Sequence, residues 1–313
     1  MRVLVLTSGD PSHAHFLDRR IQVLSSLGVE VTTLVVPGGG KVGMKRSPVD
    51  YLRFVPEVLA TSSTNGFDLV HANYGLTAPA ALAQPKRPIV LSLWGTDLFG
   101  PFGWVSRTCA PRCDEVVVMS EEMAEALPCD ASVIPHGIDL DAFAPESKAA
   151  ARDRADWDAD RYQVLFPYSP SREVKDFDRA RRVVDAVDRR LDRPVELQVV
   201  HGEHYDNIPT YMNAADVLLL TSRSEGSPNT IKEAMACNLP VVSTDVGDVR
   251  DRLNGVEPSA VADTDIGLIE ALTGILQRGE PSNGRQHVTD MAMERTGEQL
   301  LSVYERALAE NGG

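Results

Sequence analysis

One stretch of the second half, residues 216–247, constrains the fold more than any other. It reads DVLLLTSRSEGSPNTIKEAMACNLPVVSTDVG. Its apolar run at 217–220 has the length and flanks of a strand buried on both faces, and residues 241–244 resemble a second strand. Between them, Ile231, Ala234 and Met235 give a helix one apolar face. A strand, a helix and a second strand form the repeating unit of a parallel α/β sheet, which we therefore expect here.

The ends of this helix carry recognisable signals. Ser227 is a favourable N-cap, and Pro228 suits the first helical position. Asn238 can end the helix in a left-handed conformation, and Pro240 prevents its continuation. We therefore expect the helix to begin at residue 228 and to end before residue 238.

Two carboxylates, Glu225 and Glu233, bracket the loop and the helix start, with seven residues between them. The unpaired N–H groups of a helix start and the helix dipole bind anions. Carboxylates beside an anion site are explained if the ligand also carries hydroxyl groups, as a phosphate joined to sugars does. The alternative is that each glutamate is a solvated surface charge.

The rest of the chain repeats the alternation of strands and helices. Helix 16–27 has its apolar pattern at Phe16, Leu17, Arg20 or Ile21, Leu24 and Leu27, and Gly28 closes it. The other expected strands are residues 3–6, 29–36, 69–72, 89–93, 115–119, 132–134, 164–166 and 195–200; the other helices are 177–191, 208–215 and 296–309. Such alternation predicts parallel sheets, with ligands beyond the carboxyl ends of the strands.

An irregular crossing at residues 133–145, which includes His136, precedes a charged segment that resembles a surface helix. We therefore expect a first domain over residues 1–150 and a second over 151–295. Residues 296–313 form a closing helix that packs back towards the first domain. His136 either lines a cleft between the domains or is a hydrogen-bonded loop residue.

Cations follow the first strand of the second half. Arg172 and Lys175 fit a diphosphate ligand; alternatively, they form a surface pair with Glu173 or Asp176.

In the first half, Trp94 and Asp97 follow strand 89–93, where this architecture places substrate groups. Asp97 can equally cap the next segment.

The composition excludes some classes of protein. A net charge of −14 argues against a general nucleic-acid binder. The charges comprise 26 Asp, 19 Glu and 25 Arg but only 6 Lys, a balance that suits a very salty cytoplasm. No run approaches the roughly 18 apolar residues of a membrane span, and the chain enters a strand at once. We expect a cytoplasmic protein without a signal peptide.

The four cysteines, Cys109, Cys113, Cys129 and Cys237, suit neither a disulfide framework nor a zinc site, and we expect small buried residues.

The glycine-rich run at 37–43 matches G-x-G-x-x-G but follows the second strand, and Pro48 interrupts a helix there, so we predict a mobile loop. Its nearby cations Lys41, Lys45, Arg46 and Arg53 either contact a phosphorylated or membrane-borne acceptor or are simply solvated.

The run EGSPNTIKEAMA from Glu225 resembles the E-x7-E signature of the retaining family-4 glycosyltransferases. Three further stretches agree in type and order with this family: VIPHGIDLDAF, SREVKDF and PTYMNAADVLLLTS. The resemblance implies a GT-B fold, in which two Rossmann-like parallel-sheet domains face each other across a cleft.

The resemblance also implies roles for individual residues. Glu233 would hold the ribose hydroxyls of a nucleoside diphosphate sugar, and Glu225 would lie by the donor sugar. Arg172 and Lys175 would neutralise the departing diphosphate without a metal or other cofactor, and the acceptor would attack from the front face. The donor would also contact Gly226, Ser227, Pro228, Asn229 and Thr230.

Two departures concern the first domain. The family often has a Gly-Gly pair where this chain has Ser8-Gly9-Asp10, and often a histidine where it has Trp94. We assign Gly9 to the donor, Asp10 and Trp94 to the acceptor, and a catalytic contact to Asp97. These departures bear directly on activity.

The expected activity is transfer of a hexose-type sugar to a glycan, a lipid-linked acceptor or a small molecule, as in cell-surface glycan synthesis, with peripheral contact at the inner face of a membrane. The alternatives are a catalytically silent nucleotide-sugar-binding subunit, an epimerase or hydrolase of the same fold, and a Rossmann oxidoreductase.

Overall fold

The computed structural model describes residues 1–8, 11–38, 46–64 and 66–311. The chain divides into two compact units: Met1–Gly137 together with Met293–Gly313, and Ile138–Ala292. The expected boundary at residue 150 falls inside the second unit. Arg152 explains this difference, because its guanidinium is buried and donates to the Ala214 carbonyl at 3.0 Å and to Asp216 at 2.6 Å. These bonds hold the segment after residue 145 against the second unit.

The first unit contains a six-stranded parallel sheet in the order β2-β1-β3-β4-β5-β6. Its strands are β1 (Arg2–Thr7), β2 (Glu30–Val35), β3 (Leu69–Ala72), β4 (Ile89–Ser92), β5 (Glu115–Val118) and β6 (Ser132–Val133). β3 and β4 are buried along their whole length, as their apolar sequences predict.

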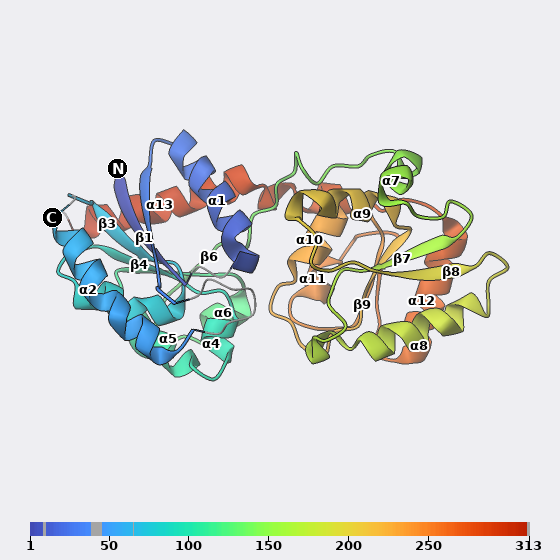
Figure 1. Ribbon diagram of the computed structural model, residues 1–313, viewed down its shortest axis with the longest axis horizontal. Coiled ribbons are helices and arrows are strands. Elements are labelled where there is room, and N and C mark those ends of the chain that lie inside the picture. Colours follow the sequence, from blue (N-terminus) through green and yellow to red (C-terminus); the bar gives the residue numbers. More distant parts are fainter. Residues whose placement is uncertain (9–10, 39–45, 65, 312–313) are drawn as a thin grey trace. The chain divides into compact units, whose positions relative to one another are not determined.

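Helices cover this sheet (Figure 1). They are α1 (Pro11–Ser26), α2 (Pro48–Thr64), α3 (Ala78–Ala83), α4 (Thr96–Phe99), α5 (Gly103–Cys109), α6 (Glu121–Glu125) and α13 (Met293–Asn311). Pro48 begins α2, where its missing N–H leaves no hydrogen bond unmade. α13 lies beside α1, and Gly297 permits this close packing, since a Cβ there would lie 2.4 Å from Val23.

The second unit contains a five-stranded parallel sheet in the order β11-β10-β9-β7-β8. Its strands are β7 (Tyr162–Phe166), β8 (Val195–Val199), β9 (Val217–Leu220), β10 (Val241–Ser243) and β11 (Ala260–Val261). Its helices are α7 (Lys148–Ala155), α8 (Phe177–Asp188), α9 (Ile208–Ala214), α10 (Asn229–Ala236), α11 (Val249–Arg252) and α12 (Asp265–Arg278). Both halves are thus parallel-sheet α/β domains, as predicted.

The segment β9-α10-β10 has the predicted strand, helix and strand. Asn238 has the left-handed conformation expected of it, with φ of 54°. The predicted helix start is wrong by one position, because Pro228 occupies the N-cap with extended backbone and Asn229 is the first helical residue. The Ser227 hydroxyl does not cap the helix but donates to Asp248 at 2.7 Å.

All four cysteines are free. The expectation of small buried residues is confirmed for Cys109 and Cys237, whereas Cys113 and Cys129 are only half-buried. Most of the glycine-rich loop lies outside the described residues, as do Lys41 and Lys45. Among the helices of the described ranges, none has the length and apolar character that a membrane span needs.

Candidate functional site

The loops that follow β7 and β9 come together because these two strands are neighbours in the second sheet. The first residue after β9, Thr221, fastens them: its buried hydroxyl bonds the carbonyls of Lys175 at 2.9 Å and Asp176 at 3.1 Å. Residues far apart in the sequence therefore meet at the carboxyl edge of the sheet, where this architecture binds ligands.

Lys175 and Glu225 form an ion pair across these two loops. Their side chains are only 4% and 15% exposed, and the Lys175 ammonium also lies 3.6 Å from the centre of the Tyr168 ring. Burial lowers the pKa of Lys175, while Glu225 raises it. The alternative of a surface pair with Glu173 or Asp176 is therefore wrong for Lys175.

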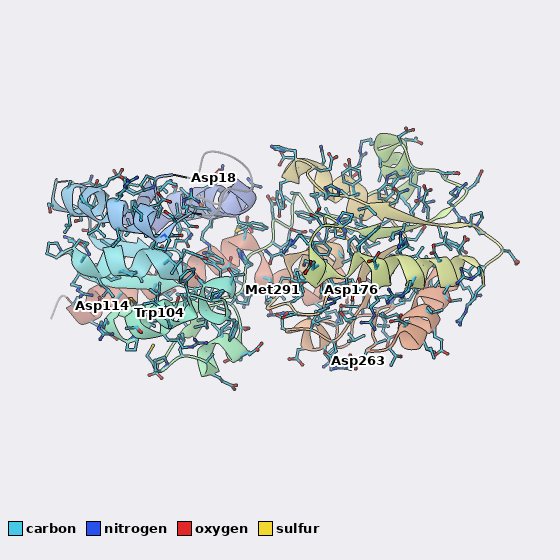
Figure 2. The ribbon with its side chains drawn as sticks, turned by 60° about the horizontal axis from the view of Figure 1, so that its bottom comes forward. Asp18, Trp104, Asp114, Asp176, Asp263 and Met291 are labelled. Atoms are coloured by element: carbon cyan, nitrogen blue, oxygen red, sulfur yellow. The ribbon has the colours of Figure 1, made fainter. Side chains whose placement is uncertain are left out.

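Arg172 lies on the exposed side of the same loop, with its guanidinium 6.0 Å from the Tyr168 ring centre. Asp176, labelled in Figure 2, does not pair with it but with Arg223 at 3.0 Å. The Arg172 guanidinium is therefore accessible to a ligand, whereas the Lys175 ammonium is buried and already paired with Glu225.

Glu233 lies in the second turn of α10 and is only 4% exposed. One of its oxygens accepts a hydrogen bond from the Tyr205 hydroxyl at 3.2 Å. Burial raises the pKa of this carboxyl to about 7, and the Tyr205 bond and Lys232 oppose that effect. Glu233 is therefore not the solvated surface charge of the alternative reading.

The start of α10 has backbone donors available. Its N-cap, Pro228, provides no side-chain acceptor, and within the described residues the N–H groups of Asn229 and Thr230 have no acceptor, whereas the Ile231 N–H donates to the Pro228 carbonyl at 3.2 Å. Beside them, the hydroxyls of Tyr168 and Thr230 share a hydrogen bond. These donors and the positive end of the helix dipole suit an anion.

A close approach of two backbone segments shapes the loop before α10. Gly247 has φ of 56°, and a Cβ on it would lie 2.0 Å from the Gly226 carbonyl oxygen. That same carbonyl accepts from the Asp248 N–H at 3.1 Å. Gly226 itself faces open space, since a Cβ there would have no neighbour within 4 Å. Only glycine fits at residue 247 without strain.

Sequence reasoning missed four side chains of this site. Tyr168 and Tyr205 follow β7 and β8, and the rule that ligands bind beyond strand ends could have found them. The fully buried Lys232 has its pKa lowered to about 8 by burial, which Asp248 opposes. Asp248 also has a buried oxygen, Oδ1, without a hydrogen-bond partner. No local pattern in the sequence marked these last two residues.

In the first unit, Asp97 joins two loops. It is 2% exposed, and its carboxylate accepts from the backbone N–H of Trp94 at 2.8 Å and of Gly75 at 2.9 Å. Burial raises its pKa. Asp97 does not cap α4, whose N-cap is Gly95, but it has a structural role, because both of its oxygens accept from backbone donors.

The other predicted acceptor-side residue that the structure describes is Trp94. Its indole N–H donates to the Asn73 carbonyl at 2.9 Å. The His136 ring lies 4.3 Å from the Trp94 ring, and the Arg20 guanidinium lies 4.7 Å from it. Sequence reasoning missed Arg20 and Asn73. Gly9 and Asp10 lie outside the described residues.

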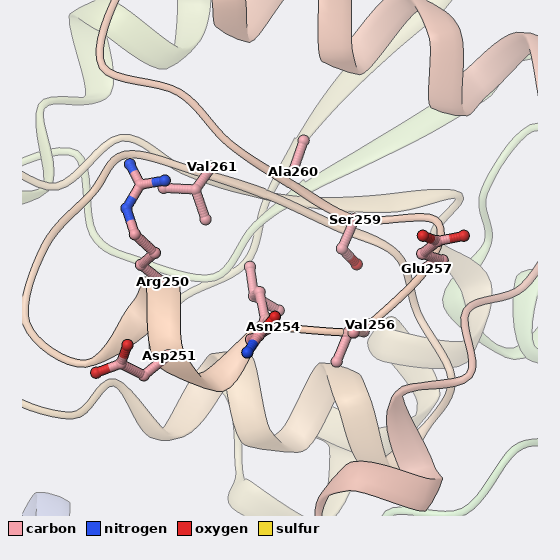
Figure 3. Close-up of a pocket in the computed structure, with 10 residues that line it drawn as sticks. Arg250, Asp251, Asn254, Val256, Glu257, Ser259, Ala260 and Val261 are labelled. Carbon is pink, nitrogen blue, oxygen red and sulfur yellow. The ribbon is translucent and has the colours of Figure 1, made fainter.

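A separate concavity of about 520 Å³ lies beside α11 and β11. Figure 3 shows its lining residues on α11, on β11 and on the turn between them. None of the predicted site residues lines it, and its Arg250 is paired with Asp245 at 2.7 Å. Elsewhere in the described ranges, no three His, Cys, Asp or Glu side chains are grouped so that they could hold a metal ion.

Two family models match the chain, one in each half. Residues 1–142 match the model described as Glycosyltransferase Family 4, and residues 179–278 match the model described as Glycosyl transferases group 1. The second match includes β9, α10, Glu225 and Glu233.

Sequence relatives carry glycosyltransferase names. The chain is 28% identical over 210 residues to TuaC of Bacillus subtilis, named for teichuronic acid biosynthesis, covering 58% of this chain and 54% of that protein. It is 27% identical over 243 residues to the D-inositol 3-phosphate glycosyltransferase of Mycobacteroides abscessus, covering 64% and 53%. The matches thus span about half the length of these relatives.

Solved structures share the fold over nearly the whole chain. A sucrose-phosphate synthase from Thermosynechococcus elongatus superposes with a TM-score of 0.82 at 18% identity, covering 99% of this chain and 100% of that one. Alr3699/HepE from Anabaena, solved with UDP and glucose, gives a TM-score of 0.71 at 16% identity, covering 97% and 99%. At these identities the likeness establishes the fold alone.

Proposed function

Because the chain belongs to the GT-B glycosyltransferases, we propose that it transfers a sugar from a nucleoside diphosphate sugar to a hydroxyl acceptor with retention of configuration. The donor binds at the carboxyl edge of the second sheet, around the start of α10. We propose that the donor is a nucleoside diphosphate sugar, that the anomeric configuration is retained, and that the reaction needs no metal ion.

The observation that carries the proposal is the buried Glu233 carboxylate beside an uncapped helix start. An ionised carboxylate offers about four acceptor positions, and Tyr205 uses one of them. A ligand with two neighbouring hydroxyls, such as a ribose, satisfies the remainder. The phosphates that follow the ribose in a nucleotide then reach the free N–H groups of the helix.

The cations suit the departure of the diphosphate. The anomeric carbon loses its bond to the diphosphate oxygen and forms one to the acceptor oxygen, while the diphosphate takes the acceptor's proton. The exposed Arg172 guanidinium offers two parallel N–H donors to the phosphate oxygens. The buried Lys175 ammonium adds a second positive charge near the phosphates, and its pair with Glu225 fixes both side chains in place. Catalysis then consists of positioning and charge stabilisation.

Glu225 lies at the sugar end of this arrangement. One of its oxygens holds Lys175 and the side chain is 15% exposed, so its second oxygen can accept from a sugar hydroxyl.

A panel of nucleoside diphosphates and nucleotide sugars, screened by thermal shift, tests the proposal. A true donor at 100 times its dissociation constant adds about 2.7 kcal/mol to the stability of the unit that binds it. The donor identified in this way is then incubated with candidate acceptors, and the released nucleoside diphosphate is measured. A panel without any shift, at several salt concentrations, would refute the donor site.

A second candidate function is a catalytically silent nucleotide-sugar-binding subunit that supports a partner enzyme. The observation that favours it is Trp94, whose indole N–H is engaged by Asn73 and which has no group that can exchange a proton at neutral pH. Donor turnover separates the two functions, because the silent subunit binds the nucleotide sugar but neither transfers nor hydrolyses it.

The proposed acceptor is a molecule with a free hydroxyl group, and its identity is found by trial of candidate compounds. The relatives named for teichuronic acid biosynthesis and for D-inositol 3-phosphate motivate trials with glycans, lipid-linked sugars and phosphorylated polyols. Peripheral contact with a membrane is part of the proposal for a lipid-linked acceptor. Co-sedimentation with anionic vesicles, in the presence and absence of the acceptor, tests that contact.

A further inference from the structure

A buried arginine of the first unit has no charge partner among the residues that the structure describes. Arg20 lies on α1 and is 6% exposed. In the described part of the chain, its guanidinium forms no hydrogen bond and no ion pair, and its close contact is the face of the Trp94 ring at 4.7 Å. A buried unpaired cation costs several kcal/mol, so its presence needs an explanation.

Among the residues that the structure describes, none supplies an anion to Arg20. His71 is fully engaged, because its ring nitrogens bond the Tyr304 hydroxyl at 2.7 Å and the Ser92 hydroxyl at 2.8 Å. Burial lowers the pKa of His71 to about 3, so that it is neutral at physiological pH. Burial also lowers the pKa of Arg20, to about 10, which leaves it protonated. Of these two buried groups, only Arg20 therefore carries a charge at physiological pH.

A second polar group beside Trp94 is also unpartnered. Asn73 follows β3 and is 8% exposed, and its side-chain oxygen receives no hydrogen bond from any described residue. Its backbone carbonyl accepts the Trp94 indole N–H, which places Asn73 against the ring that Arg20 covers. β3 and β4 are neighbours, so both residues lie at the carboxyl edge of the first sheet. An unmade bond at a buried oxygen costs about 1–3 kcal/mol.

From these two unpartnered groups we infer that the carboxyl edge of β3 and β4 receives an oxyanion of the acceptor, with Arg20 binding the anion and the Asn73 oxygen accepting from a neighbouring hydroxyl. The ligand class is a sugar or polyol that carries a phosphate or carboxylate. Contact with the flat Trp94 ring leaves the edge N–H groups of the guanidinium available for bidentate binding. That this ligand is the acceptor rests on the proposed function.

Tryptophan fluorescence of the full chain tests this inference, because Trp94 is in contact with the proposed site. Trp104, labelled in Figure 2 and 63% exposed, is replaced by phenylalanine to reduce background signal. The protein is titrated with inorganic phosphate, glucose 6-phosphate, glucuronate and glucose. We expect saturable changes with the anions and none with glucose. The phosphate and carboxylate arms identify which oxyanion binds.

Arg20→Gln should weaken binding of the preferred anion about 10–150-fold, the range for charged hydrogen bonds of about 1.5–3 kcal/mol. Arg19→Gln is the matched control, since Arg19 is the exposed neighbour on the same helix and its variant loses the same charge. Equal weakening in both variants, or none in Arg20→Gln, would overturn the inference.

Thermal unfolding separates ligand binding from a purely structural role. Removal of an unpaired buried charge should leave Arg20→Gln at least as stable as the parent. If Arg20 had a purely structural role, the variant would be less stable than the parent. If Arg20→Gln does not fold, Asn73→Asp serves as the second variant. It introduces a carboxylate near the guanidinium and should weaken anion binding; unchanged affinity would overturn the inference.

The inference and the proposed function can fail separately. Nucleotide-sugar binding is measured independently by its own thermal shift. Donor binding without anion binding overturns only the present inference. Anion binding that depends on Arg20, in a protein that binds no donor, supports this site and refutes the proposed activity.

Discussion

Replacement of Glu233 by glutamine should raise the free energy of unfolding and, at the same time, weaken the binding of the proposed donor. The substitution keeps the shape of the side chain and an acceptor for the Tyr205 hydroxyl, which lies 3.2 Å away. It removes only the negative charge that burial disfavours. A residue present for packing would give the opposite result, a loss of stability with no change in donor affinity.

The magnitude follows from the pKa of Glu233, which burial raises from 4.5 to about 7. The folded state therefore retains this proton at pH values where the unfolded state has lost it. Stability from this group is fully present below pH 4.5, falls as the pH rises to about 7, and is then constant. At 1.36 kcal/mol per pH unit, the ionised side chain costs about 3 kcal/mol at pH 8, and glutamine avoids this cost.

Donor affinity should change in the other direction. Hydrogen bonds to a charged group contribute about 1.5–3 kcal/mol, so loss of the carboxylate should weaken donor binding about 10–150-fold. The parent protein should also bind a nucleotide sugar more tightly at pH 8 than at pH 6, because ionisation occurs near pH 7. In Glu233→Gln this pH dependence should be absent.

Urea unfolding and calorimetric titration of parent and variant measure these effects at pH 8 and at pH 5.5. The stability difference should shrink by about 2 kcal/mol at the lower pH, where the folded parent is also neutral at Glu233. A variant that is less stable at pH 8, or that binds donor as tightly as the parent does, would refute the assignment of Glu233 to the ribose.

Four other substitutions and a change of salt concentration should have separable effects. Arg172→Ala should lower turnover about 10–100-fold and change the free energy of unfolding by no more than about 0.5 kcal/mol, because Arg172 is exposed. Lys175→Ala should lower the free energy of unfolding by about 3–5 kcal/mol, because it leaves Glu225 as an uncompensated charge. Equal stability of the two variants in urea would contradict this difference. Gly247→Ala should cost about 2 kcal/mol or more, whereas Gly279→Ala, also at positive φ but without a neighbour within 4 Å, should cost about 1 kcal/mol. The acidic, lysine-poor composition should make the melting temperature rise with salt, and a melting temperature independent of salt would disprove that expectation.

The sequence by itself determined the class of the fold, because strand and helix periodicity are local. The strand at Val217–Leu220, the helix after it and the left-handed turn at Asn238 all follow from residues a few positions apart. The spacing of Glu225 and Glu233 also predicted a ligand site there, which we propose to be the donor site, since a helix start between two carboxylates is a local feature. The precise N-cap was not predictable, because Ser227 has a distant competitor for its hydroxyl in Asp248.

Tertiary structure alone decided which partners meet. Lys175 reaches Glu225 only because β7 and β9 are adjacent in the sheet, and an alternation of strands and helices does not specify that order. Likewise, helical periodicity predicts only that Arg20 lies near the apolar face of its helix. Packing against Trp94, a residue that follows another strand, makes Arg20 a buried cation without a counter-charge among the described residues. Burial and charge pairing depend on residues remote in sequence, so only the folded chain defines them.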